Sequence, residues 1–84
     1  MLHVNQVKYL NDYRVWLSFD NGESGEVDLF VELWGEMFEP LKDKNLFATV
    51  KLDDTLQTIT WQNGADFAPE FLLELIKNNS NHAY

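Results

Sequence analysis

Cysteine is absent from this chain of 84 residues. The absence excludes disulfides, zinc–cysteine sites, iron–sulfur clusters and catalysis by a thiol, and it fits a reducing cytoplasm. Long apolar runs are also missing, and the N-terminal residues contain no apolar signal-peptide core. We therefore expect a cytoplasmic protein with no membrane segment.

Basic residues are scarce: six Lys and Arg stand against fourteen Asp and Glu, which gives a net charge of −8. Direct nucleic-acid binding is not expected, because it depends on neutralising phosphates. One stretch carries most of the negative charge and contains no Lys or Arg; its acids are Asp20, Glu23, Glu26, Asp28, Glu32, Glu36 and Glu39. This acidic run is either a solvated surface that resists aggregation or a docking surface for a small basic protein.

The first half of the chain reads as an antiparallel meander. Alternating apolar residues predict three strands, over residues 3–10, 14–19 and 23–29. The alternation slips between Val4 and Val7, which predicts a bulge or a late start of the first strand. Asn21 followed by Gly22 is the strongest hairpin signal, because both residues accept the positive φ angles of a tight turn.

The middle of the chain is a connection followed by a second pair of strands. Asp28 is placed to cap a helical turn that Gly35 ends, and Asp43 is placed to cap another. Residues 50–52 and 58–61 then predict a two-stranded hairpin.

Pro69 begins a helix that we expect to reach about Lys77. Its apolar side chains cover an arc of roughly 200°, wider than one sheet face needs. The helix therefore lies in a groove or meets a second copy, and we expect a homodimer formed through this helix or through the outer face of the sheet. The fold class is α+β, with a small, mostly antiparallel five-stranded sheet, short helical turns and this C-terminal helix. One domain spans residues 1–77, and residues 78–84 are expected to form a disordered tail.

Two tryptophans lie at positions that suggest a surface. The alternation places Trp16 on the outer sheet face, and Trp34 lies in the connection. An outward tryptophan indicates an interface, unless the connection folds over that face and covers it. The sequence leaves both interpretations open.

The chain offers few groups for catalysis. His3 and His82 have no partner at the spacing of a catalytic triad or a metal site. Asp53 and Asp54 are candidates for an acid–base pair or a cation site, but adjacent carboxylates at a turn are usually just solvated. We expect no catalytic residue, no metal and no cofactor. A concave site in which Asp66 faces Asp53 or His3 would instead favour a hydrolase or transferase.

The densest local pattern runs from Trp61 to Pro69. Asn63 and Gly64 predict a tight turn, and Pro69 suits the first position of a helix. Asp66 is placed to accept hydrogen bonds from the turn or from the helix start. Alternatively, its carboxylate is exposed in a partner or ligand site.

These residues resemble a family of small bacterial proteins known as domain of unknown function 2442. The segments that carry the resemblance are Val7–Leu10, Leu17–Gly25, Val27–Leu29, Phe38–Leu41, Leu46–Phe47 and Ile59–Asp66. The most specific is Trp61–Asp66 followed by Pro69–Leu72, although Gln62 stands where members usually carry proline. The resemblance implies a small α+β domain and carries over no catalytic residues.

The resemblance also bears on partners. Some members continue into a C-terminal helix-turn-helix domain, which we do not expect here because the chain stops at Tyr84. Members are often encoded beside a second small family, an arrangement similar to a toxin–antitoxin pair.

Two functional hypotheses follow. The first is a non-enzymatic protein-interaction domain, antitoxin-like or accessory, that binds a small basic protein. The second is a small-molecule or ion sensor domain, of the type attached to DNA-binding modules in longer relatives, with a pocket lined by Trp61, Phe67 and Phe71. The candidate partner or ligand surface comprises Trp16, Glu26, Asp28, Glu32, Trp34, Glu36, Asp66 and Phe67. The turn and capping residues are Asn21, Gly22, Asn63, Gly64, Asp66 and Pro69.

Overall fold

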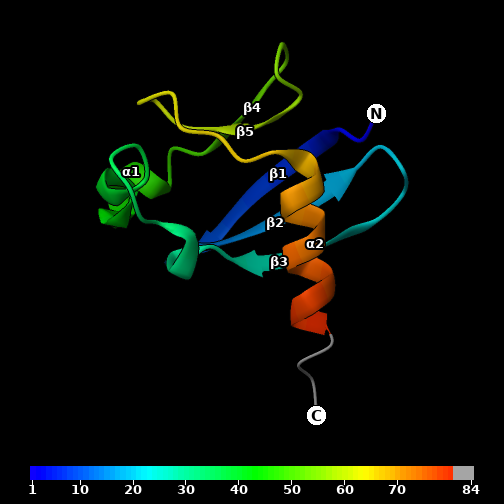
Figure 1. The fold of residues 1–84 in the computed structure, drawn as a ribbon, viewed down its shortest axis with the longest axis horizontal. Coiled ribbons are helices and arrows are strands. Elements are labelled where there is room, and N and C mark those ends of the chain that lie inside the picture. The colour runs from blue at the N-terminus through cyan, green and yellow to red at the C-terminus, as the bar shows by residue number, and fades with distance from the viewer. Residues whose placement is uncertain (81–84) are drawn as a thin grey trace.

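A three-stranded antiparallel sheet forms the first part of the protein (Figure 1). The computed structural model describes residues 1–80. Its first strands, β1 (Val4–Asn11), β2 (Arg14–Phe19) and β3 (Ser24–Asp28), are ordered β1-β2-β3, which confirms the predicted meander. The register of β1 against β2 shifts between Val4 and Gln6, where the sequence predicted a bulge.

The turn between β2 and β3 is built by the residues that signalled it. Gly22 has φ 90°, a conformation that glycine adopts without strain. The side chain of Asn21 accepts a hydrogen bond from the Glu23 N–H at 3.0 Å and donates one to the Glu23 carboxylate at 2.8 Å. Asn21 and Gly22 therefore form the predicted turn, and the asparagine side chain closes it.

The connection after β3 consists of three short helical segments: η1 (Phe30–Glu32), η2 (Glu39–Lys42) and α1 (Lys44–Phe47). They are held to the core by completely buried apolar side chains; these are Leu29, Leu33, Leu41 and Phe47. Asp43 caps α1 as predicted, because its carboxylate accepts a hydrogen bond from the Asn45 N–H at 2.9 Å.

The predicted hairpin forms a second, separate sheet from β4 (Lys51–Asp53) and β5 (Thr58–Thr60). The five expected strands are therefore present but divided between two sheets. The N–H of Val4 donates to the Gln57 carbonyl at 3.0 Å and joins the start of β1 to this hairpin. Both threonines of β5 are buried, since the strand has packed neighbours on both faces.

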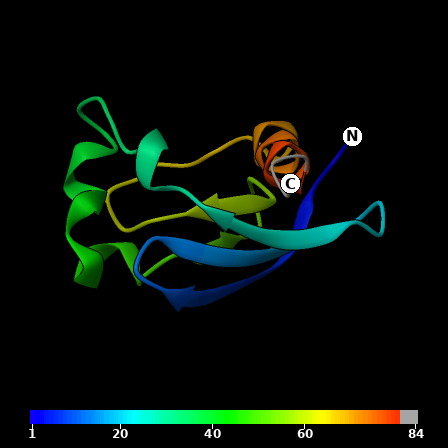
Figure 2. The same cartoon turned by 90° about the horizontal axis from the view of Figure 1, so that it is seen from below.

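The terminal helix, α2 (Pro69–Ser80), lies across the inner face of the first sheet and packs on β3 (Figures 1 and 2). Leu72 and Ile76 are its buried contacts. A Cβ placed on Gly25 of β3 would lie 2.5 Å from Cγ2 of Ile76, so glycine allows this close approach. Among residues 1–80, no helix is long and apolar enough to cross a membrane.

The helix is longer than the sequence predicted. Instead of ending at about Lys77 it continues through residues 78–80, because the backbone needs no apolar pattern to extend a helix already docked by its earlier turns. These three residues were expected in a disordered tail, and that part of the prediction is wrong. The rest of the expected tail, residues 81–84, lies outside the described residues.

Candidate functional site

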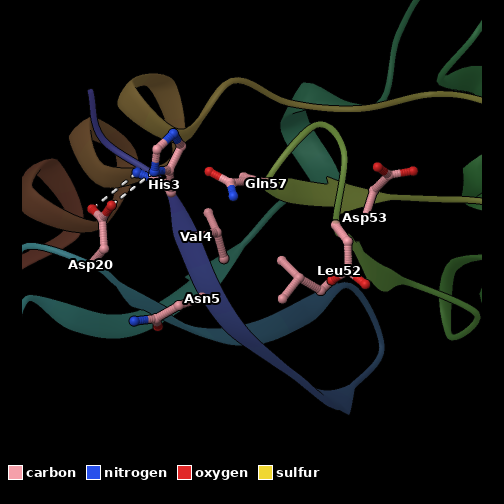
Figure 3. A pocket seen from close by; sticks show the side chains of 8 residues that line it. His3, Val4, Asn5, Asp20, Leu52, Asp53 and Gln57 are labelled. Atoms are coloured by element: carbon pink, nitrogen blue, oxygen red, sulfur yellow. Dashed lines mark hydrogen bonds and ion pairs between the residues drawn. The ribbon is translucent and has the colours of Figure 1, made fainter.

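An open cavity lies where the start of β1 meets the β4–β5 hairpin (Figure 3). Its volume is about 250 Å³ and it is lined by His3, Val4, Asn5, Asp20, Leu52, Asp53, Asp54 and Gln57. The lining comes from both sheets and from the β2–β3 turn. The cavity therefore gathers a histidine and three carboxylates from three separate parts of the sequence.

His3 and Asp20 are bound to each other at one side of this cavity (Figure 3). The His3 ring Nδ1 lies 2.9 Å from an Asp20 carboxylate oxygen, and the His3 N–H donates to the other oxygen at 3.1 Å. The Asp20 N–H donates in return to the His3 carbonyl at 3.0 Å. Antiparallel pairing of β1 with β2 thus gives His3 a carboxylate partner that local spacing did not reveal.

This pair affects the ionisation of the carboxyl group. The hydrogen bond from the His3 backbone N–H holds the pKa of Asp20 below its ordinary value, and the His3 ring acts in the same direction. Both side chains remain about a third or more exposed, so the pair is partly screened by water. Its structural effect is to fix the N-terminus of the chain to the β2–β3 turn.

Asp53 is occupied by the turn that joins β4 to β5. Its Oδ1 accepts hydrogen bonds from the N–H groups of Thr55 and Leu56, both at 2.8 Å. The N–H of Gln57 donates to the Asp53 carbonyl at 2.7 Å. Asp53 therefore closes a turn, just as Asp20 binds His3, so two of the three carboxylates that line the cavity already have hydrogen-bond partners. No group of three or more potential metal ligands comes together within residues 1–80.

Folding pairs much of the acidic run with basic side chains from elsewhere. The pairs are Asp20–His3, Glu23–Lys77, Glu26–Arg14 and Glu39–Lys42. Each exposed pair contributes little to stability. Together they divide the run, so that it does not present one uniform acidic surface.

Three acids of the run are left: Asp28, Glu32 and Glu36. The Asp28 carboxylate accepts a hydrogen bond from the Phe30 N–H at 3.0 Å, but the N-cap of η1 is Leu29 and not Asp28 as predicted. The helical turn also ends at Glu32, before Gly35. Glu32 and Glu36 form no ion pair within the described part of the chain. Both lie in the connection that follows β3, and their charge remains available to another molecule.

The same connection exposes large apolar side chains. We call residues Phe30–Met37 the exposed connection. Phe30 is 47% exposed, Val31 76%, Trp34 70% and Met37 47%. Isolated exposed apolar residues are common on protein surfaces, but four within eight residues form a group of the kind found at binding sites.

Contacts at both ends hold the exposed connection in place. Leu33 is buried at its centre. At its end, the Asn63 side chain donates a hydrogen bond to the Met37 carbonyl at 2.8 Å. At its start, the Phe30 ring lies 5.0 Å from the ring of Tyr13. The apolar side chains are therefore displayed on an anchored backbone.

The outer face of the first sheet is a second surface. Lys8, Trp16 and Glu26 are paired across its three strands and, with Leu10, line a cavity of about 340 Å³. All four residues belong to the sheet itself, so the connection does not cover this cavity. Trp16 therefore lies on the outer face, as predicted, with its ring partly buried by neighbouring side chains.

The chain was compared with protein-family patterns and with known proteins. The sequence pattern of the family described as protein of unknown function (DUF2442) matches residues 4–78. The chain belongs to the DUF2442 family. No curated protein matches it.

A solved structure shares the DUF2442 fold seen here. It is the crystal structure of "Putative DNA Binding Protein NE0471" from Nitrosomonas europaea ATCC 19718, with 22% sequence identity and a TM-score of 0.83. The match covers 96% of this chain and 52% of that one. The present chain therefore spans about half the length of that protein, and the likeness shows the fold.

The segment that carried the DUF2442 resemblance forms a structural corner. Trp61 is buried, and its indole N–H donates to the Phe47 carbonyl at 2.8 Å. The Asn63 side chain accepts a hydrogen bond from the Ala65 N–H at 3.1 Å. Gly64 has φ 88°, and its N–H donates to the Trp61 carbonyl at 3.0 Å. Asn63 and Gly64 thus form the turn predicted for them.

Asp66 does not act as a cap, which corrects the prediction. Its backbone pairs with Thr60 in a strand-like bridge. In that geometry Ala65 and Phe67 point inward and the Asp66 side chain points to solvent. Within residues 1–80 its carboxylate accepts no hydrogen bond. The helix begins at Pro69, as predicted.

Phe67 is part of the core and does not belong to a ligand or partner surface. It is 8% exposed. Its ring centroid lies 4.5 Å from that of Phe38, 5.6 Å from that of Phe71 and 5.9 Å from that of Trp61. These rings fill the space where we expected a pocket, because the connection brings Phe38 onto Phe67.

Sequence reasoning selected Trp34 but missed Phe30, Val31 and Met37. Leu29 and Leu33 are four residues apart, as are Phe30 and Trp34. A short helical turn buries one such pair and exposes the other, and periodicity does not say which. The composition of the stretch, apolar residues interspersed with acids, was the signal available.

Proposed function

We propose that this DUF2442 protein is a non-enzymatic interaction domain, antitoxin-like or accessory, whose exposed connection binds a small basic protein. One observation carries the proposal. Large apolar side chains are exposed together in a segment whose charged residues are Glu32 and Glu36.

The chemistry of the exposed connection favours a protein partner. Tryptophan and other aromatic side chains dominate binding energy when a partner covers them and excludes water. Trp34 and Phe30 are placed for that role. The two glutamates beside them attract a basic surface and orient it, while the net charge of −8 steers such a partner over longer distances.

The cavity beside His3 is a weaker candidate for the binding surface, because two of its carboxylates already have hydrogen-bond partners within the protein. In the cavity beside His3, Asp53 closes a turn and Asp20 binds the histidine. Direct contact with nucleic acid is opposed by the net charge. The similar protein described as DNA binding matches this chain over 52% of its own length. We propose no direct nucleic-acid binding for the present chain, because its net charge opposes it.

A capture experiment tests the proposal. The protein is immobilised and exposed to lysate of the native organism at low and high salt. We expect a small basic protein that is retained at low salt and released at high salt. A variant with Glu32→Gln and Glu36→Gln should retain less of it. The matched control, Glu70→Gln with Glu74→Gln on the exposed side of α2, removes the same charge and should retain as much.

Recovery of an acidic partner, or equal retention by both charge variants, would contradict this function. Recovery of no specific protein at any low-salt condition would contradict it as well.

The sensor function is the second candidate, and the cavity beside His3 favours it. At about 250 Å³ the cavity accommodates an ion or a very small metabolite. A ligand at 100 times its dissociation constant raises stability by about 2.7 kcal/mol, which a thermal-shift screen detects. A shift that His3→Ala abolishes would support the sensor; the absence of a shift with any metabolite or ion would count against it.

We also propose a homodimer, through the outer sheet face around Trp16 or through α2. The partly exposed Phe71 supports the helix and the cavity beside Trp16 supports the sheet. Light scattering should give the mass of two chains. A mass of one chain across a wide concentration range would refute the dimer.

A further inference from the structure

The outer edge of β3 is open. β3 is the last strand in the order β1-β2-β3, and Figure 1 shows it at the margin of the sheet with α2 crossing its face. Two hydrogen bonds fix how it pairs with β2. The Phe19 N–H donates to the Glu23 carbonyl at 2.8 Å, and the Leu29 N–H donates to the Tyr13 carbonyl at 2.9 Å.

These bonds determine which backbone groups of β3 face outward. Alternate residues of a strand direct their N–H and C=O to the same side. Glu23 and Leu29 face β2, and the odd-numbered residues between them do the same. The N–H and C=O groups that point away from β2 therefore belong to Ser24, Glu26 and Asp28. Within residues 1–80 no other strand pairs with this edge, and all three residues are exposed.

The open edge is acidic and leads directly into the exposed connection. Glu26 and Asp28 lie on the strand, and Phe30 follows two residues later. Along the same path lie Glu32 and Glu36, which have no ion-pair partner among the described residues. Unpaired strand edges bind extended segments through main-chain hydrogen bonds, while side chains give the specificity.

We propose that the partner contributes an extended basic segment that adds to β3 as a fourth strand and continues over the exposed connection. This inference rests on the proposed function and specifies how the basic partner binds. The added strand satisfies the outward backbone groups of β3, and its Lys or Arg side chains lie beside Glu26 and Asp28. Its apolar side chains continue towards Trp34.

A second copy of this chain fits the edge less well. Twofold antiparallel pairing of β3 with itself through the outward residues places acids beside acids, for example Glu26 opposite Glu26. Like charges directly opposite each other destabilise strand pairing. Arg14 pairs with Glu26 and reduces this repulsion, but Asp28 has no ion-pair partner among residues 1–80, so the edge still favours a basic segment over self-association.

Ser24 allows a test that removes a hydrogen-bond donor without removing a charge. It is the first residue of β3, and its N–H points away from β2. Proline is tolerated at the first residue of an edge strand when its nitrogen faces solvent. Ser24→Pro removes one of the three outward donors and should therefore weaken strand addition, and Ser24→Ala is the matched control that keeps the N–H group.

The probe is a capped peptide of about six residues, a typical strand length, alternating lysine and valine. Its binding is followed by amide hydrogen exchange at residues 24, 26 and 28 and by the indole NMR signal of Trp34. We expect the peptide to slow exchange at these amides by about tenfold or more in the wild type and in Ser24→Ala. Ser24→Pro should bind about tenfold more weakly. The same peptide with every backbone nitrogen methylated has no main-chain donor on either edge and should not bind, which tests the inference on the unaltered protein.

The outcomes separate the two proposals. A peptide that shifts the Trp34 signal without protecting the β3 amides overturns strand addition and leaves the proposed function standing. A peptide that changes neither signal overturns strand addition, and the capture experiment then decides the proposed function by itself. Protection that appears without peptide and grows with protein concentration overturns the inference in favour of a second copy.

Discussion

The packing of α2 on the sheet depends on the absence of a side chain at Gly25. A Cβ at this position would lie 2.5 Å from Cγ2 of Ile76 and 3.7 Å from its Cβ. Gly25 is not among the residues with a positive φ angle, so its backbone accommodates alanine. The substitution Gly25→Ala therefore isolates a steric conflict between strand and helix.

The size of this conflict follows from contact distances. Carbon atoms pack favourably at roughly 3.5–4.0 Å, so the new methyl group overlaps Cγ2 by about 1 Å. Cγ2 is attached to the branched Cβ of Ile76 and cannot move away without a change of rotamer or a shift of the helix. Overpacking of this kind costs about 1–3 kcal/mol. With a urea m-value near 1 kcal/mol/M, the unfolding midpoint of Gly25→Ala should fall by about 1–3 M.

A double-mutant cycle with Ile76→Ala tests the reasoning. Ile76→Ala removes Cγ2 and should itself destabilise the protein, by about 2–5 kcal/mol if the site relaxes poorly. In that background Gly25→Ala should cost less than about 0.5 kcal/mol, which gives a coupling of about 1–3 kcal/mol. Urea titrations followed by tryptophan fluorescence and by circular dichroism measure all four proteins. An equal cost in both backgrounds, or no cost in the wild-type background, would refute the steric account.

Three further predictions concern polar contacts. The pKa of Asp20 lies below its ordinary value of 3.8 because the His3 N–H donates a hydrogen bond to the carboxylate. The ionised carboxylate therefore stabilises the fold fully above pH 3.8, and this stability is lost as the pH falls through the lowered pKa. Acid unfolding followed by circular dichroism should become less steep in Asp20→Asn; an unchanged acid profile would speak against the pair. Asn63→Ala removes both side-chain hydrogen bonds of its turn and should lower the free energy of unfolding by about 1–2 kcal/mol in urea titrations, with a smaller loss for Asn63→Asp. Thr58→Val leaves the Phe67 carbonyl without its buried donor, now at 2.6 Å, and should cost about 1–3 kcal/mol, whereas a valine variant as stable as Thr58→Ser would exclude that role.

The features that sequence predicted well are local ones. Alternation located β2 because its buried and exposed residues differ every second position, and the pair Asn21-Gly22 located the following turn because its conformation depends on those two residues. Pro69 located the helix start for a similar reason. Each of these signals is contained within a few neighbouring residues.

The features that sequence did not predict depend on contacts between distant segments. The spacing of His3 gave no hint of Asp20, because strand pairing brings them together. The acidic run looked uniform until basic side chains from β2, η2 and α2 reached it. Asp66 was assigned a capping role from its distance to the helix, whereas a bridge to Thr60 turns its side chain outward.

The residues proposed for the candidate surface also divide into those that local sequence identified and those that depend on distant contacts. Trp34 could be selected from the sequence as an apolar side chain among acids. Phe67 was selected as part of the lining of a ligand pocket, but three neighbouring rings bury it. Which apolar residues of the connection stay exposed is decided by the docking of Leu29 and Leu33 into the core.

The claim that the exposed connection is the binding surface is tested most directly by comparing two truncations of exposed apolar side chains. Trp34 is 70% exposed within the connection, and Leu56 is 50% exposed in the β4–β5 turn. The affinity of the captured basic protein is measured for wild type, Trp34→Ala and Leu56→Ala at low salt. We expect Trp34→Ala to weaken binding by about tenfold or more, equivalent to about 1.4 kcal/mol, and Leu56→Ala to leave it unchanged. Unchanged binding by Trp34→Ala, or equal losses in both variants, would contradict the account.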